Sequence, residues 1–518
     1  MAALMSPTYV LSIHGGTESA SVGLFDLSGN QLASAAHPYP TEFPRAGWAE
    51  QDPDQWWSAV VTATRACLGK ASVEARHIIG LSLDATTCTL VALGPDGQQL
   101  RPALLWMDVR AADQANRIFQ TGHRALCYSP SGCNAEWMLS KALWLAENEP
   151  DVYARTKHLI EYTDWLVYRL TGRLVLNKNT ATQRWYYHGR DWGWPTDLFA
   201  AVGVPGLEHK FPKEIVPAGQ AVGRLLPEAA AALGLPDSVT VYQGGGDAFV
   251  ALLGMNVAEP GRLGLITGSS NVMGAFVEQE FHGTGLYGAF PDAVVPGLCL
   301  VEAGQVSTGS ILAWFKRYFA ADLPPMSAYS ILDGEAQAIA PGAGGVIALD
   351  YFQGNRTPHT DSRARGAIWG LSLHTTRAHL FRALMEGIAY GTHHILEILA
   401  SYGQSPQEIY ACGGATRSDT FMQIYADVCG IPISVAKVTD APLVGGAILA
   451  ATGAGAFPDL RAAAQVMVKV SKTYVPDMER HARYQFYYER YKETYPQLRA
   501  LMHQVGQQEE LNARGRAA

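Results

Sequence analysis

The pattern that most constrains this fold occurs twice along the chain. Residues Tyr9–Asp26 read as an apolar strand, a turn of glycine and hydroxyl residues, and a second apolar strand; residues Arg262–Phe276 have the same form. The hydroxyls of the two turns, on Thr17 and Ser269, lie about half the chain length apart. This repetition predicts two related domains that face each other, with two unrelated hairpins as the alternative.

Apolar runs alternate with longer segments of helical periodicity between these hairpins. Ile78–Leu83, Val239–Gln243 and Glu408–Cys412 have the β-branched, Gly- or Asp-bounded composition of buried strands. Asp54–Lys70 and Arg377–Ser401 instead repeat apolar residues at three-to-four spacing, as helices do. Such alternation is typical of an α/β protein with largely enclosed sheets.

The length and composition favour two large globular domains. A chain of 518 residues is too long for one core, and 48% hydrophobic against 17% charged residues excludes a disordered chain. The polar, Pro- and Gly-containing segment 255–261 interrupts the pattern. We therefore predict an N-terminal domain of residues 1–255 and a C-terminal domain of residues 256–518.

Charge, cysteine content and hydropathy exclude several classes of partner. The net charge of −8 argues against nucleic acid binding through a global positive field. Seven cysteines without a CxxC pair indicate free thiols in a reducing compartment. The sequence has no signal-peptide pattern at its start and no run of roughly 18 apolar residues that could span a membrane. We expect a cytoplasmic protein with no membrane partner.

Three glycine-rich turns follow strands and could bind a nucleotide, although the GxxxxGK[ST] and GxGxxG signatures are absent. Gly15-Gly16-Thr17 and Thr267–Ser270 offer backbone N–H groups and hydroxyls that suit phosphate oxygens. In the third turn, Gly413 and Gly414 would let a flat ring approach the backbone, ahead of the helix that carries Ser418. Each turn alone is also an ordinary chain reversal.

One carboxylate stands out at the end of a predicted strand. Asp247 follows three consecutive glycines, which we expect to clear space around it, and α/β sites gather at strand ends. A turn former or helix cap is the alternative role for a single loop aspartate. The glycines favour a ligand-facing carboxylate.

These loops, in this order, resemble the FGGY family of carbohydrate kinases within the sugar kinase–Hsp70–actin superfamily. The resemblance spans roughly residues 9–495. Its further motifs are Gly47–Asp52, Trp106–Arg110, Leu170–Gly172, Gly354–Pro358, Gly366–Leu371, Met385–Gly387 and Gly445–Ala447.

The resemblance implies two ribonuclease H-like domains around a cleft, with ATP and Mg²⁺ as cofactors. It implies that Asp247 is the general base that accepts the proton of the attacking sugar hydroxyl, and that Asp247 also serves Mg²⁺. It places ATP binding at Gly16, Thr17, Thr267, Gly268, Ser269, Gly413, Gly414 and Ser418, and substrate binding at Trp106, Asp108, Arg110 and Asp247.

Two positions depart from the family pattern. The first turn of the family begins with an aspartate that helps to hold Mg²⁺, whereas this chain has His14, a poor ligand for a hard cation. Asp247 and water could suffice, Glu18 could compensate, or activity could be weakened. The stretch Asp84–Thr89 replaces the Met-His-Gly contact of xylulokinases, which favours ribulokinase-like and other pentulose or polyol kinases.

The leading interpretation is therefore ATP-dependent phosphorylation of a ketopentose hydroxyl, of the xylulose or ribulose type. A polyol kinase of the glycerol or erythritol type is one alternative. A non-catalytic sugar- or nucleotide-binding relative is another, because His14 replaces the usual aspartate. We expect a small-molecule sugar or polyol as the partner, with a homodimer left open.

Overall fold

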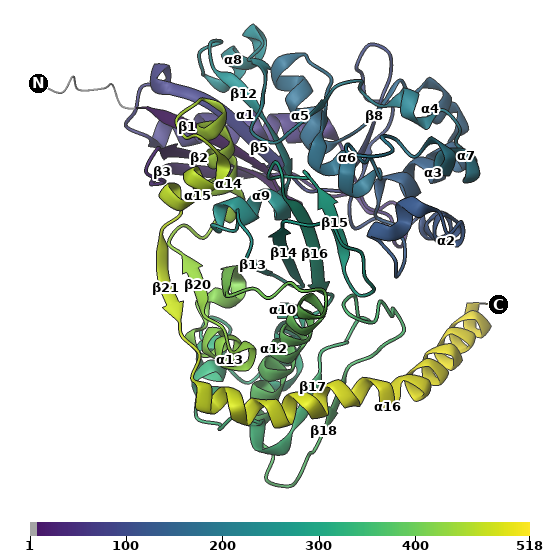
Figure 1. The fold of residues 1–518 in the computed structure, drawn as a ribbon, viewed down its shortest axis with the longest axis vertical. Coiled ribbons are helices and arrows are strands. Elements are labelled where there is room, and N and C mark those ends of the chain that lie inside the picture. Colours follow the sequence, from purple (N-terminus) through teal and green to yellow (C-terminus); the bar gives the residue numbers. More distant parts are fainter. Residues whose placement is uncertain (1–7, 518) are drawn as a thin grey trace, which may run out of the picture.

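The computed structural model describes residues 8–517 and contains two large β-sheets, one above the other in Figure 1. The first sheet has the strand order β11-β12-β5-β1-β2-β3. Its strands are β1 (Tyr9–Gly15), β2 (Ser19–Asp26), β3 (Gln31–Pro38), β5 (Ile78–Ala85), β11 (Ala221–Arg224) and β12 (Thr240–Gly246).

The second sheet has the order β15-β16-β14-β13-β19-β20-β21. Its strands are β13 (Arg262–Thr267), β14 (Asn271–Val277), β15 (Tyr287–Pro291), β16 (Cys299–Gln305), β19 (Glu408–Gly413), β20 (Ile433–Ala436) and β21 (Val470–Tyr474).

The two sheets repeat one topology. Strand β1 pairs antiparallel with β2 and parallel with β5, which is itself parallel to β12. In the same way β13 pairs antiparallel with β14 and parallel with β19, which is parallel to β20. The prediction of two related α/β domains from the repeated hairpin is confirmed.

Helices and three minor sheets surround this frame. The minor sheets contain β4 (Glu50–Gln51), β6 (Leu90–Leu93), β7 (Ala103–Leu104) and β8 (His158–Glu161); β9 (Leu176–Asn177) and β10 (Ile215–Val216); and β17 (Ile347–Leu349) and β18 (Ala367–Trp369). The α-helices are α1 (Pro53–Lys70), α2 (Ala112–Gln120), α3 (Met138–Asn148), α4 (Pro150–Arg155), α5 (Tyr162–Thr171), α6 (Lys178–Arg184), α7 (Thr196–Ala201), α8 (Pro227–Leu233), α9 (Asp247–Gly254), α10 (Gly309–Phe319), α11 (Ala328–Gln337), α12 (Arg377–Ser401), α13 (Asp419–Cys429), α14 (Ala441–Gly453), α15 (Leu460–Met467) and α16 (Met478–Ala517).

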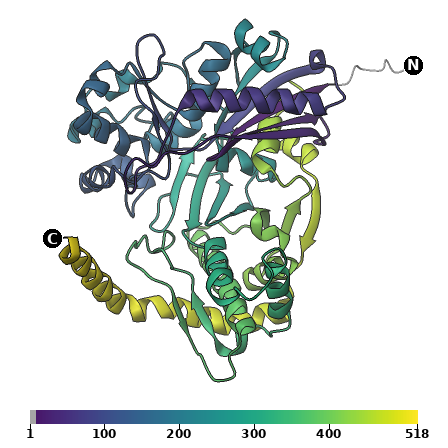
Figure 2. The same ribbon diagram turned by 180° about the vertical axis from the view of Figure 1, so that it is seen from behind.

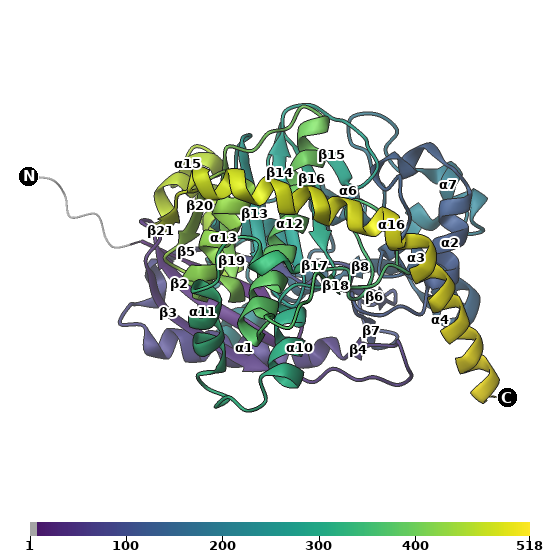
Figure 3. The same ribbon diagram turned by 90° about the horizontal axis from the view of Figure 1, so that it is seen from below.

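The helices cover the faces of the sheets, so each sheet has its own core. Helix α1 lies across the face of the first sheet that Figure 2 turns toward the viewer. Helix α16 crosses the second domain at the side of α12 and α13, and its carboxyl end projects from the body (Figure 3). Its tyrosines at three-to-four spacing pack inward, with Tyr484, Tyr488, Tyr491 and Tyr495 all buried.

Helices α14 and α15 return from the second half of the chain to the first sheet, as their position above the second domain in Figure 1 shows. Helix α14 packs on β1 and β5 and crosses α9 at very close range. A Cβ atom at Gly445 would lie 2.1 Å from the carbonyl oxygen of Val250, and one at Gly254 would lie 2.0 Å from that of Ala441. The core of the first domain therefore contains residues from both halves of the chain. The domain boundary at residue 255 stays a prediction.

The described residues also bear on the expected absence of membrane spans and on the state of the cysteines. No helix within residues 8–517 is both long and apolar enough to cross a membrane. All seven cysteines are free thiols, and five of them are buried.

We predict that Gly445→Ala destabilises the protein by roughly 1–3 kcal/mol, because the added methyl forces α9 and α14 apart. The matched control is Gly69→Ala near the end of α1, where a Cβ atom meets nothing within 4 Å, so stability should stay level or rise slightly. Urea denaturation of the three proteins measures the difference. Equal unfolding free energies for both variants would contradict the proposed close packing.

Candidate functional site

A cavity of about 370 Å³ lies between the two sheets and is lined from both. The first domain contributes His14, Thr17, Thr86, Thr87, Cys88, Trp106, Glu136, Arg184 and Asp247 with the start of α9. The second domain contributes Gly268, Ser269, Ser270, Glu302, Arg356 and Cys412, among others. The cavity thus joins the strand-end loops of both sheets, where ligands of α/β proteins gather.

The register of three parallel strands brings together the charged groups at the centre. His14 on β1 is the direct partner of Asp84 on β5, and Asp84 is also the partner of Gly245 on β12. Asp247 follows the end of β12 as the first residue of α9. The three side chains therefore lie side by side at the carboxyl ends of neighbouring strands.

His14 and Asp84 form an ion pair, with 2.6 Å between Nδ1 and Oδ1. Asp84 is fully buried, so its charge needs a partner. Burial acts to lower the pKa of His14, but the carboxylates of Asp84, Asp247 and Asp440 outweigh it and raise that pKa to about 9. The ring is therefore an imidazolium near neutral pH. Its Nε2 atom lies on the side of Gly16, where a Cβ atom would come within 3.1 Å of it.

Asp247 is half-buried, and its Oδ1 accepts a hydrogen bond from the backbone N–H of Ala248 at 2.8 Å. Burial raises the pKa of this carboxyl above its usual range, and the charge of His14 opposes that rise. A carboxylate in this setting binds a proton more readily than an exposed one.

The three glycines before Asp247 are also required by backbone and side-chain packing. A Cβ atom at Gly244 would lie 1.4 Å from the carbonyl oxygen of Leu83, and one at Gly246 would lie 3.0 Å from the Cβ of Thr87. The glycines let β12 and its turn press against β5, and this close approach fixes the backbone that carries Asp247.

The two hydroxyl turns face the cavity from opposite domains. Thr17 lines it from the first sheet, and Gly268 and Ser269 line it from the second. The indole N–H of Trp106 donates a hydrogen bond to Oγ1 of Thr17 at 3.1 Å, which ties this predicted substrate residue to the first turn. Gly16 adjoins Thr17 without lining the cavity.

Thr267 joins the second and third turns. Its Oγ1 donates to the carbonyl oxygen of Cys412 at 2.7 Å and accepts from the N–H of Ala415 at 3.1 Å. Gly413 has φ +93°, and a Cβ atom there would lie 2.0 Å from the carbonyl oxygen of Thr267. The hydroxyl of Thr267 thus holds the third turn in shape.

The third turn continues from the cavity wall at Cys412 towards α13. A Cβ atom at Gly414 would meet nothing within 4 Å, so this glycine borders open space. Ser418 caps α13, with its Oγ accepting from the N–H of Phe421 at 3.0 Å. Neither residue lines the cavity itself.

The structure does not bring Asp108 and Arg110 into the cavity. Both side chains are buried, and Nη2 of Arg110 lies 2.7 Å from Oδ2 of Asp108. The guanidinium also lies over the rings of Trp48 and Trp144, at 3.7 and 4.9 Å from the two centroids. This arrangement stabilises the loop that carries Trp106.

Four charged residues of the cavity escaped the sequence analysis: Glu136, Arg184, Glu302 and Arg356. Nη2 of Arg184, from α6, donates to Oε2 of Glu302, on β16, at 2.9 Å, so this buried pair links the two domains. Burial acts to lower the pKa of Arg184, but Glu302 and other acids outweigh it, and the pKa is raised. The Nε and Nη1 atoms of Arg184 have no hydrogen-bond partner among the described residues. A single arginine between Gln183 and Trp185 carries no motif signal, so only the fold reveals it.

The donor set suits a metal held mainly by its substrate. No group of three or more His, Cys, Asp or Glu side chains within residues 8–517 could hold a metal ion. Asp247 supplies one carboxylate in the cavity, whereas Glu18 is exposed and does not line it. Mg²⁺ is commonly held by one or two carboxylates, water and substrate phosphates, so the residues present fit that ion.

Comparison with known proteins identifies one family that matches most of the chain. Residues 9–254 match the N-terminal domain, and residues 263–454 the C-terminal domain, of the FGGY family of carbohydrate kinases. The ribulokinase of Anoxybacillus flavithermus is 33% identical, with 94% of each chain covered. The xylulose kinase of Bacillus subtilis is 29% identical over 95% of this chain and 98% of its own. The structure of the xylulose kinase from Rhodospirillum rubrum, at 28% identity, has a TM-score of 0.87 and covers 96% of this chain and 100% of that one.

Two repeated domains around a cleft lined by hydroxyl turns define the actin/Hsp70/sugar kinase type of fold, as the sequence predicts. The chain belongs to the FGGY family of carbohydrate kinases. Its enzyme class is accordingly that of phosphotransferases with an alcohol acceptor, and this family uses ATP, generally with Mg²⁺.

We predict that the His14–Asp84 pair makes stability depend on pH. His14 has a pKa of about 9 in the folded protein against 6.5 for the free side chain. Because the folded pKa of His14 is the higher one, the stabilisation that its charge provides is lost as the pH rises from 6.5 towards 9. Burial also raises the pKa of Asp84 to about 6, so the ion pair itself is complete only above that pH. The double variant His14→Gln/Asp84→Asn replaces the pair with neutral groups and should lose this dependence.

Urea denaturation at pH 6, 7.5 and 9 measures this pH dependence of the unfolding free energy. His209→Gln, at an exposed histidine, is the control. A constant stability difference between wild type and the double variant across that range would contradict the ion pair.

Proposed function

We propose that this protein transfers the γ-phosphoryl group of ATP to a hydroxyl of a ketopentose of the ribulose or xylulose type. The observation that carries the proposal is the position of Asp247, a half-buried carboxylate in a cavity that residues of both hydroxyl turns and four charged sugar-binding candidates also line. The names of the relatives support the choice of ketopentose.

Asp247 is the proposed general base. It accepts the proton of the substrate hydroxyl while that oxygen forms a bond to the γ-phosphorus, and the bond from phosphorus to the bridging oxygen of ADP breaks. The raised pKa that burial gives Asp247 brings the base closer to its working pH. Phosphoryl transfer depends mainly on positioning and charge neutralisation, so one base is sufficient.

The turns are the proposed nucleotide site. Gly16 and Thr17 from one domain and Thr267, Gly268 and Ser269 from the other would bind the phosphates. Gly413, Gly414 and Ser418 would border the adenine, since the space at Gly414 is open. Asp247 and the nucleotide phosphates would hold Mg²⁺, which neutralises phosphate charge when bound.

The charged residues that line the cavity are the proposed sugar contacts. The Nε and Nη1 atoms of Arg184 can donate to hydroxyl or carbonyl oxygens, and the carboxylates of Glu302 and Glu136 can accept from sugar hydroxyls. Trp106 would close the site from the side of Thr17. A polyhydroxylated substrate with an internal carbonyl satisfies both donors and acceptors. We also propose that this substrate is phosphorylated in the cytoplasm.

We predict that Asp247→Asn reduces kcat at least ~100-fold with folding nearly intact, because the proton acceptor is removed. ATP binding measured without Mg²⁺ should also stay nearly intact, since the variant removes a proposed Mg²⁺ ligand but no proposed phosphate contact. Coupled ADP release measures turnover, and calorimetry measures ATP binding. Asp237→Asn, at an exposed aspartate outside the cavity, is the matched control. Retention of most of the kcat would remove Asp247 from this role.

The same assay over ribulose, xylulose, glycerol and erythritol tests the substrate class. The highest kcat/KM is expected with a ketopentose. A preference for glycerol or erythritol would favour a polyol kinase. ATP binding without ADP release for any substrate would favour a non-catalytic relative.

His14 is proposed to act as a fixed cation beside the phosphates, in place of the acid that the family pattern has there. Asp84 keeps the ring charged, and the Nε2–H beside Gly16 is free to donate to a phosphate oxygen. The substitution therefore changes how phosphate charge is neutralised and is compatible with catalysis.

We predict that His14→Asp lowers the Tm, because it places a second carboxylate against the buried Asp84. The double variant His14→Asp/Asp84→Asn removes this repulsion and should recover the Tm, while the KM for ATP remains raised at least ~10-fold through loss of the cation. Thermal unfolding measures the Tm. Turnover measured over a range of ATP and Mg²⁺ concentrations gives the KM for ATP and the Mg²⁺ requirement. A lower Mg²⁺ requirement with undiminished kcat in the double variant would contradict the role of His14 as a cation.

A further inference from the structure

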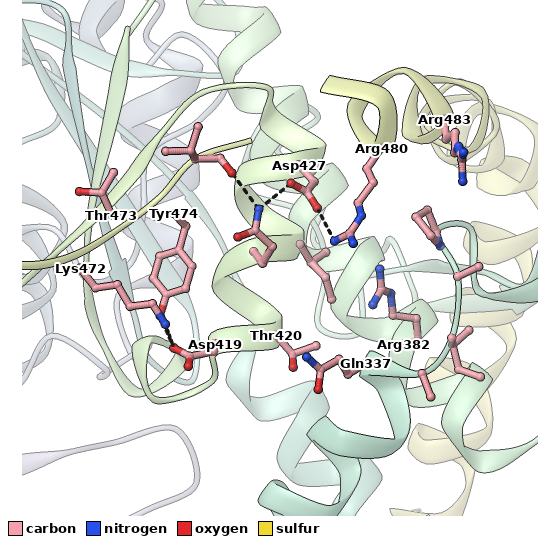
Figure 4. A pocket seen from close by; sticks show the side chains of 17 residues that line it. Gln337, Arg382, Asp419, Thr420, Asp427, Lys472, Thr473, Tyr474, Arg480 and Arg483 are labelled. Atoms are coloured by element: carbon pink, nitrogen blue, oxygen red, sulfur yellow. Dashed lines mark hydrogen bonds and ion pairs between the residues drawn. The ribbon is translucent and has the colours of Figure 1, made fainter. Parts of the chain in front are cut away.

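A cavity of about 780 Å³ in the second domain, outside the catalytic cleft, is lined by acidic and basic side chains that pair with one another (Figure 4). Lys472 lies 2.7 Å from Asp419, and Arg480 lies 3.5 Å from Asp427. Buried ionisable groups of a different kind lie behind the wall of the catalytic cavity, where they bind backbone groups of the loops that form this wall.

Lys141, on α3, is a fully buried cation that holds two loops. Its Nζ atom donates hydrogen bonds to the carbonyl oxygens of Cys88 and Leu105, at 2.5 Å each. Burial lowers the pKa of Lys141 to about 8, which reflects the cost of an ammonium group inside the domain. An apolar side chain of similar size would avoid that cost, so we expect the lysine to serve the two carbonyls that it binds.

Glu161, at the end of β8, is a fully buried carboxyl that binds the first of these residues as well. Its Oε1 atom accepts a hydrogen bond from the N–H of Cys88 at 2.7 Å, and its Oε2 atom accepts from the hydroxyl of Thr180, on α6, at 2.6 Å. Lys141 and Glu161 therefore bind both backbone polar groups of Cys88. The φ of Cys88 is +61°, which is unfavourable for a residue with a Cβ atom, so these two hydrogen bonds stabilise a strained conformation.

The segment that contains Cys88 forms part of the catalytic cavity. Thr86, Thr87 and Cys88 all line the cavity from the first domain. Burial raises the pKa of Asp247, and the backbone N–H of Thr87 is among the groups that oppose this rise. The segment 86–88 therefore borders the proposed base.

The second carbonyl that Lys141 binds belongs to the loop of Trp106. Leu105 precedes Trp106, which lines the cavity and donates a hydrogen bond to Thr17 at 3.1 Å. One buried ammonium group thus joins two separate segments of the cavity wall, and the distance between these segments depends on it.

We infer that Lys141 and Glu161 are positioning residues, which shape the catalytic cavity by holding the segments 86–88 and 105–106 in place. Neither side chain lines the cavity, so both act through the backbone that they bind. The two segments do not belong to the proposed nucleotide turns. On the proposed function the wall that they form contacts the sugar, so this role rests on that function for the identity of the substrate.

The first experiment compares Lys141→Met, which keeps the length of the side chain but removes its donors, with the wild type by coupled ADP release. The KM for the ketopentose should rise at least ~10-fold, because a displaced wall misplaces the bound sugar, and the KM for ATP should change much less. Lys210→Met is the matched control, since Nζ of Lys210 also donates to two carbonyl oxygens, at 2.9 and 2.7 Å, but does not line the cavity. It should leave both KM values unchanged.

Alkylation of the cysteines by iodoacetamide, followed by mass spectrometry, measures the state of the wall without turnover. Cys88 is 2% exposed, and Cys67, in α1, is fully buried. In Lys141→Met, Cys88 should react at least ~10-fold faster while Cys67 reacts as in the wild type, because only the held segment opens. General loss of stability would raise both rates. Labelling requires neither ATP nor sugar, so it decides the positioning role even if the kinase proposal fails.

A second pair of variants tests the same role if Lys141→Met does not fold. Glu161→Gln keeps an oxygen acceptor for the N–H of Cys88 and should match the wild type in labelling and in the KM for the sugar. Glu161→Met removes the acceptor and should raise both. Identical behaviour of the two variants would overturn the inference.

For a folded Lys141→Met protein, three results would also overturn it. These are an unchanged labelling rate at Cys88, equal acceleration at Cys88 and Cys67, and a rise of the two KM values by the same factor.

Discussion

The parallel register of β1, β5 and β12 is the constraint on which the catalytic site depends. It sets His14 opposite Asp84, and Asp84 opposite Gly245, so that three charged groups end neighbouring strands at one edge of the sheet. A shift of one residue in any of these strands would turn its terminal side chain to the other face. The close contact of Gly244 with Leu83 excludes larger side chains and thereby fixes β12 against β5. The position of Asp247 follows from backbone packing, before any ligand is present.

The exchange of an acid for His14 changes the electrostatics of this edge without leaving a charge unpaired. An isolated imidazolium beside β5 would be costly, as would the fully buried Asp84 without a partner. Together they form a pair whose outer charge is positive and lies on the side of the first hydroxyl turn. The cavity then has a fixed cation near the proposed phosphate site, with the carboxylate of Asp247 left as the base.

Local patterns predicted the frame of this protein well because each hairpin and buried strand carries its own signal. The repeated strand–glycine–hydroxyl–strand segment predicted the two-domain topology. The roles given to the turn residues and to Asp247 stay predictions, as geometry alone does not test them. Arg184 and Glu302 were missed because their meeting depends on how two domains face each other, which no local pattern contains. Asp108 and Arg110 belonged to the right loop, but their charges satisfy each other away from the cavity.

The return of α14 and α15 to the first sheet has a consequence for synthesis on the ribosome. The strands of the first domain are complete once β12 has emerged, yet α14, which covers β1 and β5, begins only at Ala441. Until then an apolar face of that sheet lacks its cover while the 194 residues 247–440 are being made. Transiently exposed apolar surface is prone to aggregation, so the first domain is vulnerable during translation until α14 folds onto it. The second domain, whose core includes the tyrosines of α16, closes last.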